Sequence, residues 1–144
     1  MKVIIRKSCL LYEPEQTACS GQFSVIQFCP DPGRAEAINV GVFLYCPDKG
    51  FISTRMRPDN DRVRRLFGEE VILEWHLESI KNNIAYRLER NKEEFKTKGH
   101  VAHFIGNLAN DIRMTELRSV RVKDPQETLA LLYDELVADP KARR

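Results

Sequence analysis

The sequence predicts an α+β domain: an antiparallel sheet, made of a β-hairpin meander plus a late strand, covered on one face by helices. Two runs rich in β-branched and aromatic residues, 23–29 and 38–46, have the length of strands. The middle of the chain repeats apolar residues at helical spacing, and an alternating segment followed by one more amphipathic stretch closes it. Strands and helices gathered in separate parts of the chain are typical of this class.

The length and charge of the chain predict one domain without a generally basic surface. With 144 residues it can bury one hydrophobic core. We expect residues 1–22 to form an amino-terminal extension, 23–138 the single α+β domain and 139–144 a short basic tail. The 23 Lys and Arg nearly balance 21 Asp and Glu, and the resulting net charge of +2 argues against a whole-surface grip on nucleic acid.

The run 38–46 is predicted to be a central strand. Alternate residues of an uninterrupted strand share a face, and both faces of this run are largely apolar. One face is expected to carry Ile38, Val40, Val42, Leu44 and Cys46. A tight turn at 47–50, with Gly50 at a positive φ, then returns the chain as a third strand over 51–57.

Two helices are predicted next. Asp59 can cap a short helix that runs to Phe67 and ends at Gly68. Trp75, on the long helix that follows, is expected to pack in the core, with a place in an interface as the alternative. The apolar stripe of the long helix consists of Leu73, Leu77, Ile80, Ile84 and Leu88. Its solvent side is expected to carry Glu74, Glu78, Lys81 and Arg90.

The carboxyl-terminal part is predicted to hold an amphipathic stretch at 100–108, a strand at 113–122 and a last helix. Asp124 and Glu127 form a capping-box-like start for that helix. Its apolar stripe consists of Leu129, Leu132, Tyr133 and Leu136. The alternation at 113–122 therefore predicts the late strand of the sheet, and the stripe predicts one covering helix.

The amino-terminal residues and the cysteines predict a cytoplasmic protein with reduced thiols. Arg6 and Lys7 interrupt the apolar start, and the sequence has no run of about 18 apolar residues. The cysteines at 9, 19, 29 and 46 lack the C-x-x-C spacing of a zinc or redox site. His100 and His103 share one helix side, but no further ligands follow at recognisable spacing, so no metal and no cofactor are expected.

Three adjoining motifs carry a resemblance to a known family. They are Phe23 and Ser24 in the first strand, then Pro30, Asp31, Pro32, Arg34 and Glu36, then Asn39, Val40, Gly41 and Val42. In these motifs the chain resembles the bacterial family known as domain of unknown function 3037, over roughly residues 23–138, although 115–117 lacks the proline expected there. The resemblance implies no particular activity; it implies a protein partner or shared pathway, because members are often encoded beside a HipA-like kinase.

The loop 30–39 is longer and more charged than a hairpin needs, which favours a binding role. Arg34 can bind a carboxylate or phosphate with its planar fork, Glu36 can orient it, and Asn39 can fix a ligand. The structural alternative is that Asp31 forms a turn, Arg34 pairs with Glu36, and Asn39 satisfies backbone groups. Gly41, after the loop, would permit close approach of another backbone.

A basic cluster follows in sequence and consists of Arg55, Arg57, Arg62, Arg64 and Arg65. Arg55 and Arg57 share one strand face and can line a groove beside Arg34 that would suit phosphate or an acidic partner. The alternative is a neutralised, solvated surface. The acidic residues that would neutralise it are Asp59, Asp61, Glu69 and Glu70.

These observations predict a non-catalytic protein-interaction or regulatory module that recognises an acidic or phosphorylated surface through Arg34, Arg55 and Arg57, with a HipA-like kinase as the implied partner. The alternatives are a nucleic-acid or nucleotide-binding domain, and an enzyme built around Asp31, Glu36 or Asn39. The absence of recognised catalytic motifs leans against an enzyme, and no catalytic residue is assigned. No membrane partner is expected, and the oligomeric state stays open.

Overall fold

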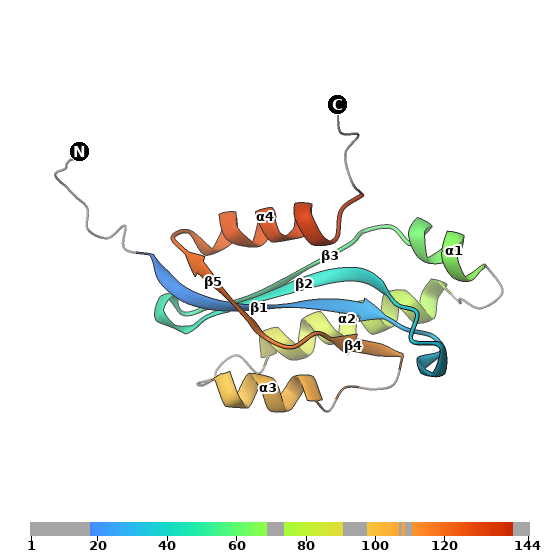
Figure 1. The fold of residues 1–144 in the computed structure, drawn as a ribbon, viewed down its shortest axis with the longest axis horizontal. Coiled ribbons are helices and arrows are strands. Elements are labelled where there is room, and N and C mark those ends of the chain that lie inside the picture. Colours follow the sequence, from blue (N-terminus) through green and yellow to red (C-terminus); the bar gives the residue numbers. More distant parts are fainter. Residues whose placement is uncertain (1–17, 69–73, 91–97, 107, 109–110, 140–144) are drawn as a thin grey trace, which may run out of the picture.

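The computed structural model describes residues 18–68, 74–90, 98–106, 108 and 111–139 and confirms the predicted α+β class (Figure 1). Its centre is an antiparallel five-stranded sheet in the order β3-β2-β1-β4, with β5 also paired to β1. The strands are β1 (Cys19–Phe28), β2 (Ile38–Cys46), β3 (Phe51–Met56), β4 (Ile112–Met114) and β5 (Arg118–Val122). The helices are α1 (Asp61–Phe67), α2 (Glu74–Arg90), α3 (Lys98–Gly106) and α4 (Pro125–Leu136).

The predicted meander is formed by β1, β2 and β3. Gly50 takes the left-handed conformation, φ 61°, that the tight turn between β2 and β3 requires. The first strand begins at Cys19, four residues before the predicted start at Phe23. The last helix begins as predicted, because the carboxylate of Asp124 accepts the backbone N–H of Gln126 at 3.1 Å.

Helices cover both faces of the sheet, which corrects the prediction of one covered face. In Figure 1, α4 lies on one side of the sheet, and α2 and α3 lie on the other. The buried side chains accordingly divide into two clusters. The α2-side core contains Phe43, Ile84 and Val101, and the α4-side core contains Leu44 and Tyr133 among others. An antiparallel sheet whose central strand is apolar on both faces needs a helix layer on each of them.

A β-bulge in β2 corrects the predicted face assignment. Ile26 of β1 pairs with Gly41, but the next residue, Gln27, pairs with Asn39, so Val40 has no partner in this register. The extra residue reverses the alternation. Ile38, Val40, Phe43 and Tyr45 lie in the α2-side core, whereas Val42, Leu44 and Cys46 lie in the α4-side core. The predicted single face for Ile38 to Cys46 is therefore wrong.

The predicted late strand is divided into β4 and β5, which pair with successive parts of β1. Thr115 lies between them and continues the contact with β1 through both its backbone and its side chain. Its N–H donates to the carbonyl of Val25 at 3.0 Å, and its hydroxyl accepts the N–H of Val25 at 2.9 Å. The buried Ser24 hydroxyl donates to the carbonyl of Thr115 at 2.7 Å.

The long helix follows its predicted apolar stripe, but two residues outside the stripe do not lie where they were predicted. Leu77, Ile84 and Leu88 are buried in the α2-side core, and Leu73 lies outside the described residues. Trp75 was expected to pack in the core but is 70% exposed. Lys81 was expected on the solvent side but is 2% exposed. None of the helices in the described part of the chain is long and apolar enough to cross a membrane.

Candidate functional site

The loop after β1 is organised by its own side chains. One carboxylate oxygen of Asp31 accepts the N–H of Gly33 at 3.1 Å, and the carbonyl of Asp31 accepts the N–H of Arg34 at 3.0 Å. These bonds form a single 3₁₀ turn at Pro32–Arg34. Ala35 then takes a left-handed conformation, φ 59°, and Arg34 Nε lies 3.1 Å from Glu36 Oε1. The predicted turn and the predicted ion pair are both present.

This loop borders a hollow beside the end of α1. The hollow has a volume of about 260 Å³ and is lined by Pro30, Asp31, Arg34, Glu36, Leu66 and Phe67, a set we call the Arg34 surface. Phe67 holds α1 against the end of β1 through an edge-to-face contact with Phe28, with ring centroids 6.2 Å apart. Leu66 is 52% exposed and the Arg34 side chain 68% exposed. An apolar side chain and an arginine therefore lie side by side in solvent.

Asn39 faces away from the Arg34 surface. Its amide donates to the carbonyl of Leu136 in α4 at 2.8 Å, and its oxygen accepts from Gln27 at 2.9 Å. Gln27 in turn accepts from the guanidinium of Arg113 in β4 at 3.1 Å. These bonds tie β1, β2 and β4 to the last turn of α4, which matches the structural alternative for Asn39.

Arg57 is committed to contacts within the fold. Its side chain is 6% exposed and donates to the carboxylates of Asp59 at 3.1 Å and Asp139 at 3.0 Å. It also donates to the carbonyl of Val137, just after α4, at 3.2 Å. An arginine with these partners anchors the end of a helix and is not open to a ligand.

Arg55 of β3 faces the α4 side, as does Arg57 just after the strand, and this agrees with the predicted shared face. Its guanidinium lies 4.6 Å from the centroid of the Tyr133 ring in α4. Neither arginine contacts the Arg34 surface: within the described residues no ion pair, hydrogen bond or pocket joins Arg34 to Arg55 or Arg57. The predicted groove of three arginines is therefore not assembled.

Lys81 is the centre of a buried polar network that sequence reasoning missed. Its ammonium donates to the carbonyl of Arg57 at 2.7 Å and to Asn60 Oδ1 at 3.0 Å, and lies 3.0 Å from Glu78 Oε2. Asn60 also donates to Glu78, at 3.0 Å. All three ammonium donors thus have acceptors. The network, which we call the Lys81 network, joins the end of β3 and the start of α1 to α2.

The pKa shifts around this network favour its charged form. Burial opposes ionisation of Glu78, but hydrogen bonds from Lys81 and Asn60 outweigh it and hold the pKa of Glu78 below its ordinary value. Burial likewise opposes the charge of Arg57, but Asp139 and Asp59 outweigh it and raise the pKa of that guanidinium. Glu78 and Arg57 therefore keep their charges at neutral pH.

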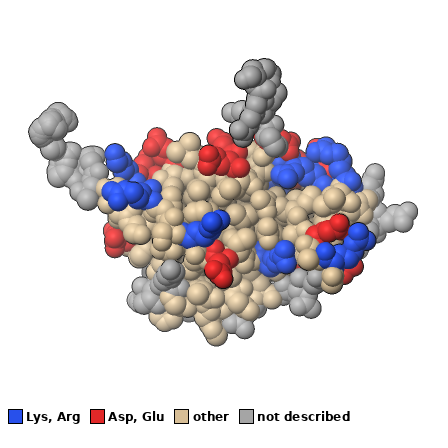
Figure 2. Space-filling model, in the orientation of Figure 1, with Lys and Arg blue, Asp and Glu red and all other residues tan. Residues whose placement is uncertain are grey.

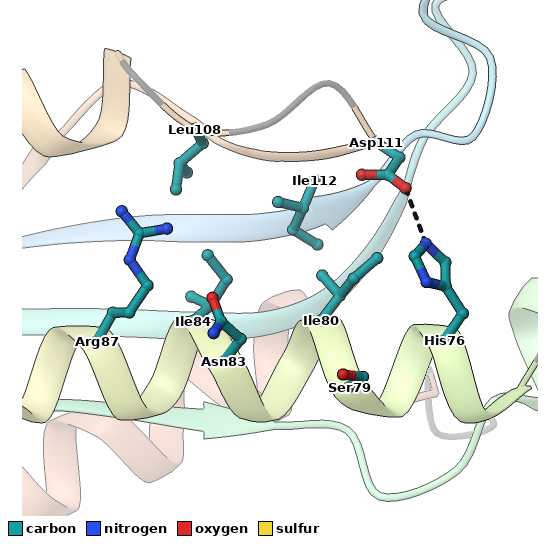
Figure 3. Close-up of a pocket in the computed structure, with 9 residues that line it drawn as sticks. All are labelled: His76, Ser79, Ile80, Asn83, Ile84, Arg87, Leu108, Asp111 and Ile112. Atoms are coloured by element: carbon teal, nitrogen blue, oxygen red, sulfur yellow. Dashed lines mark hydrogen bonds and ion pairs between the residues drawn. The ribbon is translucent and has the colours of Figure 1, made fainter.

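A second pocket, of about 200 Å³, lies between α2 and β4 (Figure 3). Figure 3 shows His76, Ile80 and Arg87 extending from α2 toward the side on which Leu108, Asp111 and Ile112 lie. Ile80, Ile84, Leu108 and Ile112 are its apolar members. His76 Nε2 lies 3.3 Å from Asp111 Oδ2 at one end. The helical spacing of its polar residues, His76, Ser79, Asn83 and Arg87, was the sequence signal that could have indicated this face.

Arg87 lies at the other end of this α2–β4 pocket. Its guanidinium is 4.9 Å from the centroid of the Phe104 ring in α3. It has no carboxylate partner in the part of the chain that the structure describes. In the same part of the chain, no group of three or more His, Cys, Asp or Glu is placed to hold a metal ion.

The fold and these surfaces define an α+β protein in which helices cover both faces of a five-stranded antiparallel sheet. The family model described as protein of unknown function, DUF3037, matches residues 23–137, and the chain belongs to this family. The match runs from β1 to the end of α4 and so includes the Arg34 surface. Neither the curated proteins nor the solved structures contain a significant match.

Proposed function

We propose that this protein is a non-catalytic interaction module that binds an acidic segment of a protein partner at the Arg34 surface. The observation that supports this most is the exposed Leu66 beside an arginine that Glu36 orients. Glu36 meets the Nε edge of Arg34, which leaves the two terminal nitrogens for a carboxylate. A partner segment with one acidic and one apolar side chain satisfies both features.

Arg34, Glu36 and Leu66 contribute little to the stability of the fold, which favours a role in binding. An exposed ion pair such as Arg34 with Glu36 contributes only about 0–1 kcal/mol to stability. Leu66 leaves about half of its surface in water, where it contributes little to either core. Arginine is enriched among the residues that carry most of the binding energy at interfaces, and an exposed apolar side chain offers surface that a partner can bury. A HipA-like kinase is the first partner to test, because the family resemblance suggests one.

The basic cluster supports a protein partner more than nucleic acid. Arg57 pairs with Asp59 and Asp139, Arg62 approaches Asp139, and Arg64 pairs with Asp61. On the face shown in Figure 2, basic and acidic side chains are interspersed and form no continuous basic stripe. Binding to a phosphate backbone draws its affinity from several unpaired cations together.

Replacing Arg34 with Glu should abolish recovery of the partner when the tagged protein is isolated from its host. The matched control is Arg65→Glu, which makes the same charge change on α1 at an exposed arginine outside the hollow. Leu66→Ser removes the apolar anchor without altering charge. With the purified partner, we expect Arg34→Glu to weaken binding by about 30-fold or more, the range of an interface hot spot.

Nuclease-treated and untreated samples are compared in parallel. A partner that Arg34→Glu loses and Arg65→Glu retains, in both samples, supports the proposal. Equal recovery by the wild type and both variants would overturn it. So would recovery of nucleic acid alone with an affinity that falls steeply as salt is added, which is the mark of counterion release.

A second candidate function is favoured by Arg87: binding of a small carboxylate with an apolar body in the α2–β4 pocket. The pocket offers a guanidinium that has no carboxylate partner among the described residues, and it lies beside isoleucine and leucine side chains. Its volume of about 200 Å³ lies below the range of roughly 300–1,000 Å³ typical of pockets for drug-sized ligands, so a small ligand fits best.

Octanoate is a suitable probe for this candidate, and 1-octanol is its uncharged counterpart. We expect octanoate to raise the melting temperature of the wild type but not of Arg87→Gln. Arg90→Gln, on the same helix but outside the pocket, should respond like the wild type. An equal shift with octanol, or with Arg87→Gln, would show that the carboxylate is not recognised at this arginine.

A further inference from the structure

Two cysteines that are far apart in sequence meet at one edge of the α4-side core. Cys19 is the first residue of β1 and Cys46 the last residue of β2, and their sulfur atoms lie 3.1 Å apart. Cys46 is fully buried, whereas Cys19 is partly exposed. Cys29 is buried in the interior and is not part of this pair, so it is a matched buried thiol in the same protein.

Cys19 also borders a surface hollow. The hollow has a volume of about 210 Å³ and is lined by Ala18, Cys19, Ser20, Ser119, Val120 and Arg121. Arg121 is exposed and lies opposite Ser20 in the β1–β5 register, one position from Cys19. It has no acidic partner among the residues that the structure describes. The strand register places the Cys19 side chain on the α4 side of the sheet and the Arg121 side chain on the other side, so this positive charge lies near the thiol but not on the same face.

We propose that Cys19 and Cys46 form an exchangeable thiol pair that anionic disulfides of the glutathione type oxidise, with Cys19 as the attacking thiol and Cys46 as the resolving thiol. The partial exposure of Cys19 lets the disulfide reach its sulfur, and the nearby Arg121 attracts the carboxylates of the disulfide. Cys46 is out of reach of such a molecule but in contact with Cys19. The two cysteines are not part of the Arg34 surface, so this proposal does not depend on the proposed function.

The environment of Cys46 supports this division of roles. Burial, together with the hydrogen bond to Cys19, raises the pKa of the Cys46 thiol to about 11. Because the thiolate is the nucleophile in disulfide exchange, a buried thiol that holds its proton does not begin the reaction. Once Cys19 carries a mixed disulfide, the sulfur of Cys46 lies in contact with the Cys19 sulfur and can attack its bond to glutathione. The pair then needs a closure of only about 1 Å to reach bonding distance.

The exchange consists of two steps. The Cys19 thiolate attacks one sulfur of glutathione disulfide, whose S–S bond breaks; the released glutathione thiolate takes up the proton that Cys19 lost. Cys46 then gives up its proton and attacks the Cys19 sulfur, which breaks the mixed disulfide and releases a second glutathione. In sum two protein thiols are oxidised to one disulfide, and one glutathione disulfide is reduced to two glutathione molecules.

Intact-mass and peptide-mapping measurements on the full-length protein test this proposal, in a Cys9→Ser background that leaves three cysteines. After treatment with glutathione disulfide, we expect the parent protein to lose two hydrogens and to yield a Cys19–Cys46 cross-linked peptide. Cys46→Ser should stop at one glutathionyl group on Cys19, and Cys19→Ser should gain none. Cys29 should stay unmodified in every folded sample and react only after denaturation.

Charge reversal examines the role of the hollow. Arg121→Glu should slow glutathionylation of Cys46→Ser several-fold, and the same substitution should speed its reaction with cystamine, a cationic disulfide. Arg118→Glu, an exposed arginine of β5 outside the hollow, should change both rates less. Circular dichroism confirms that each variant is folded. The proposal is overturned if folded Cys46→Ser reacts no faster at Cys19 than at Cys29, or if the parent protein forms no Cys19–Cys46 bond.

Discussion

Replacing Lys81 with Met is expected to lower the free energy of unfolding by about 2–4 kcal/mol, because it leaves buried acceptors without a donor. Methionine fills a similar volume, so the loss measures the polar contacts more than a cavity. Asn60 is 5% exposed and cannot turn to water for a replacement partner, whereas the Glu78 side chain is 44% exposed and can. The partial exposure of Glu78 therefore keeps the expected loss below that of a fully buried ion pair.

Urea denaturation at neutral pH measures this change. The matched control is Lys123→Met, at an exposed lysine between β5 and α4, which should alter stability by no more than about 0.5 kcal/mol. A Lys81→Met variant as stable as this control would show that the buried contacts contribute no net stability.

A comparison of the wild type with Lys81→Met should show how the Lys81 network depends on pH. The folded-state pKa of Glu78 is depressed, so its ionisation stabilises the folded protein above the ordinary glutamate pKa of about 4.3, and this contribution is lost as pH falls through the folded value. Without Lys81 that depression is reduced. The stability difference between wild type and Lys81→Met should therefore shrink as pH is lowered from about 5 to about 3.

The second large effect is expected at Gly41, where β2 and β3 approach closely. Gly41 pairs with Met56, and a Cβ at this position would overlap the sulfur of Met56 and lie 3.1 Å from the carbonyl oxygen of Arg55. The flexible methionine can move aside, but the backbone carbonyl of Arg55 cannot without shifting β3 away from β2. We expect Gly41→Ala to cost about 1 kcal/mol and Gly41→Val about 3 kcal/mol, the range of overpacked cores.

Gly33→Ala is the matched control for Gly41→Ala. A Cβ at Gly33 would meet only Asp31, at the ordinary contact distance of 3.4 Å, and the backbone there does not have a positive φ. Its stability in urea should stay within about 0.5 kcal/mol of the wild type. If Gly41→Val is equally harmless, β2 and β3 have room to separate and the close approach is not required for the fold.

Local patterns in the sequence were sufficient for the α+β class and for most elements. The apolar runs of β1 and β2, the turn at Gly50 and the cap at Asp124 each depend on residues within a few positions of one another. The same holds for the turn at Asp31 and the ion pair between Arg34 and Glu36. Such features follow from backbone geometry and short-range hydrogen bonds, which the sequence records directly.

The errors arose where a residue's environment depends on a distant segment. The bulge at Val40 reverses the faces of β2. Because both faces of this strand are largely apolar, the alternation of residue types does not reveal where one residue has been inserted. Lys81 was placed in solvent because a lysine on a helix is usually exposed, but acceptors from Arg57 and Asn60 surround it. The exposure of Trp75 likewise depends on which side of α2 meets the sheet.

The candidate sites divide in the same way. The sequence by itself determined the fold class, the order of the strands in the meander and the charged loop with Arg34 and Glu36, because these depend on local spacing. Only the tertiary structure placed Leu66 beside that loop, withdrew Arg57 into the interior and brought Cys19 to Cys46. The physical reason is that side-chain chemistry is encoded at each position, but its partners are chosen by how the sheet and helices pack.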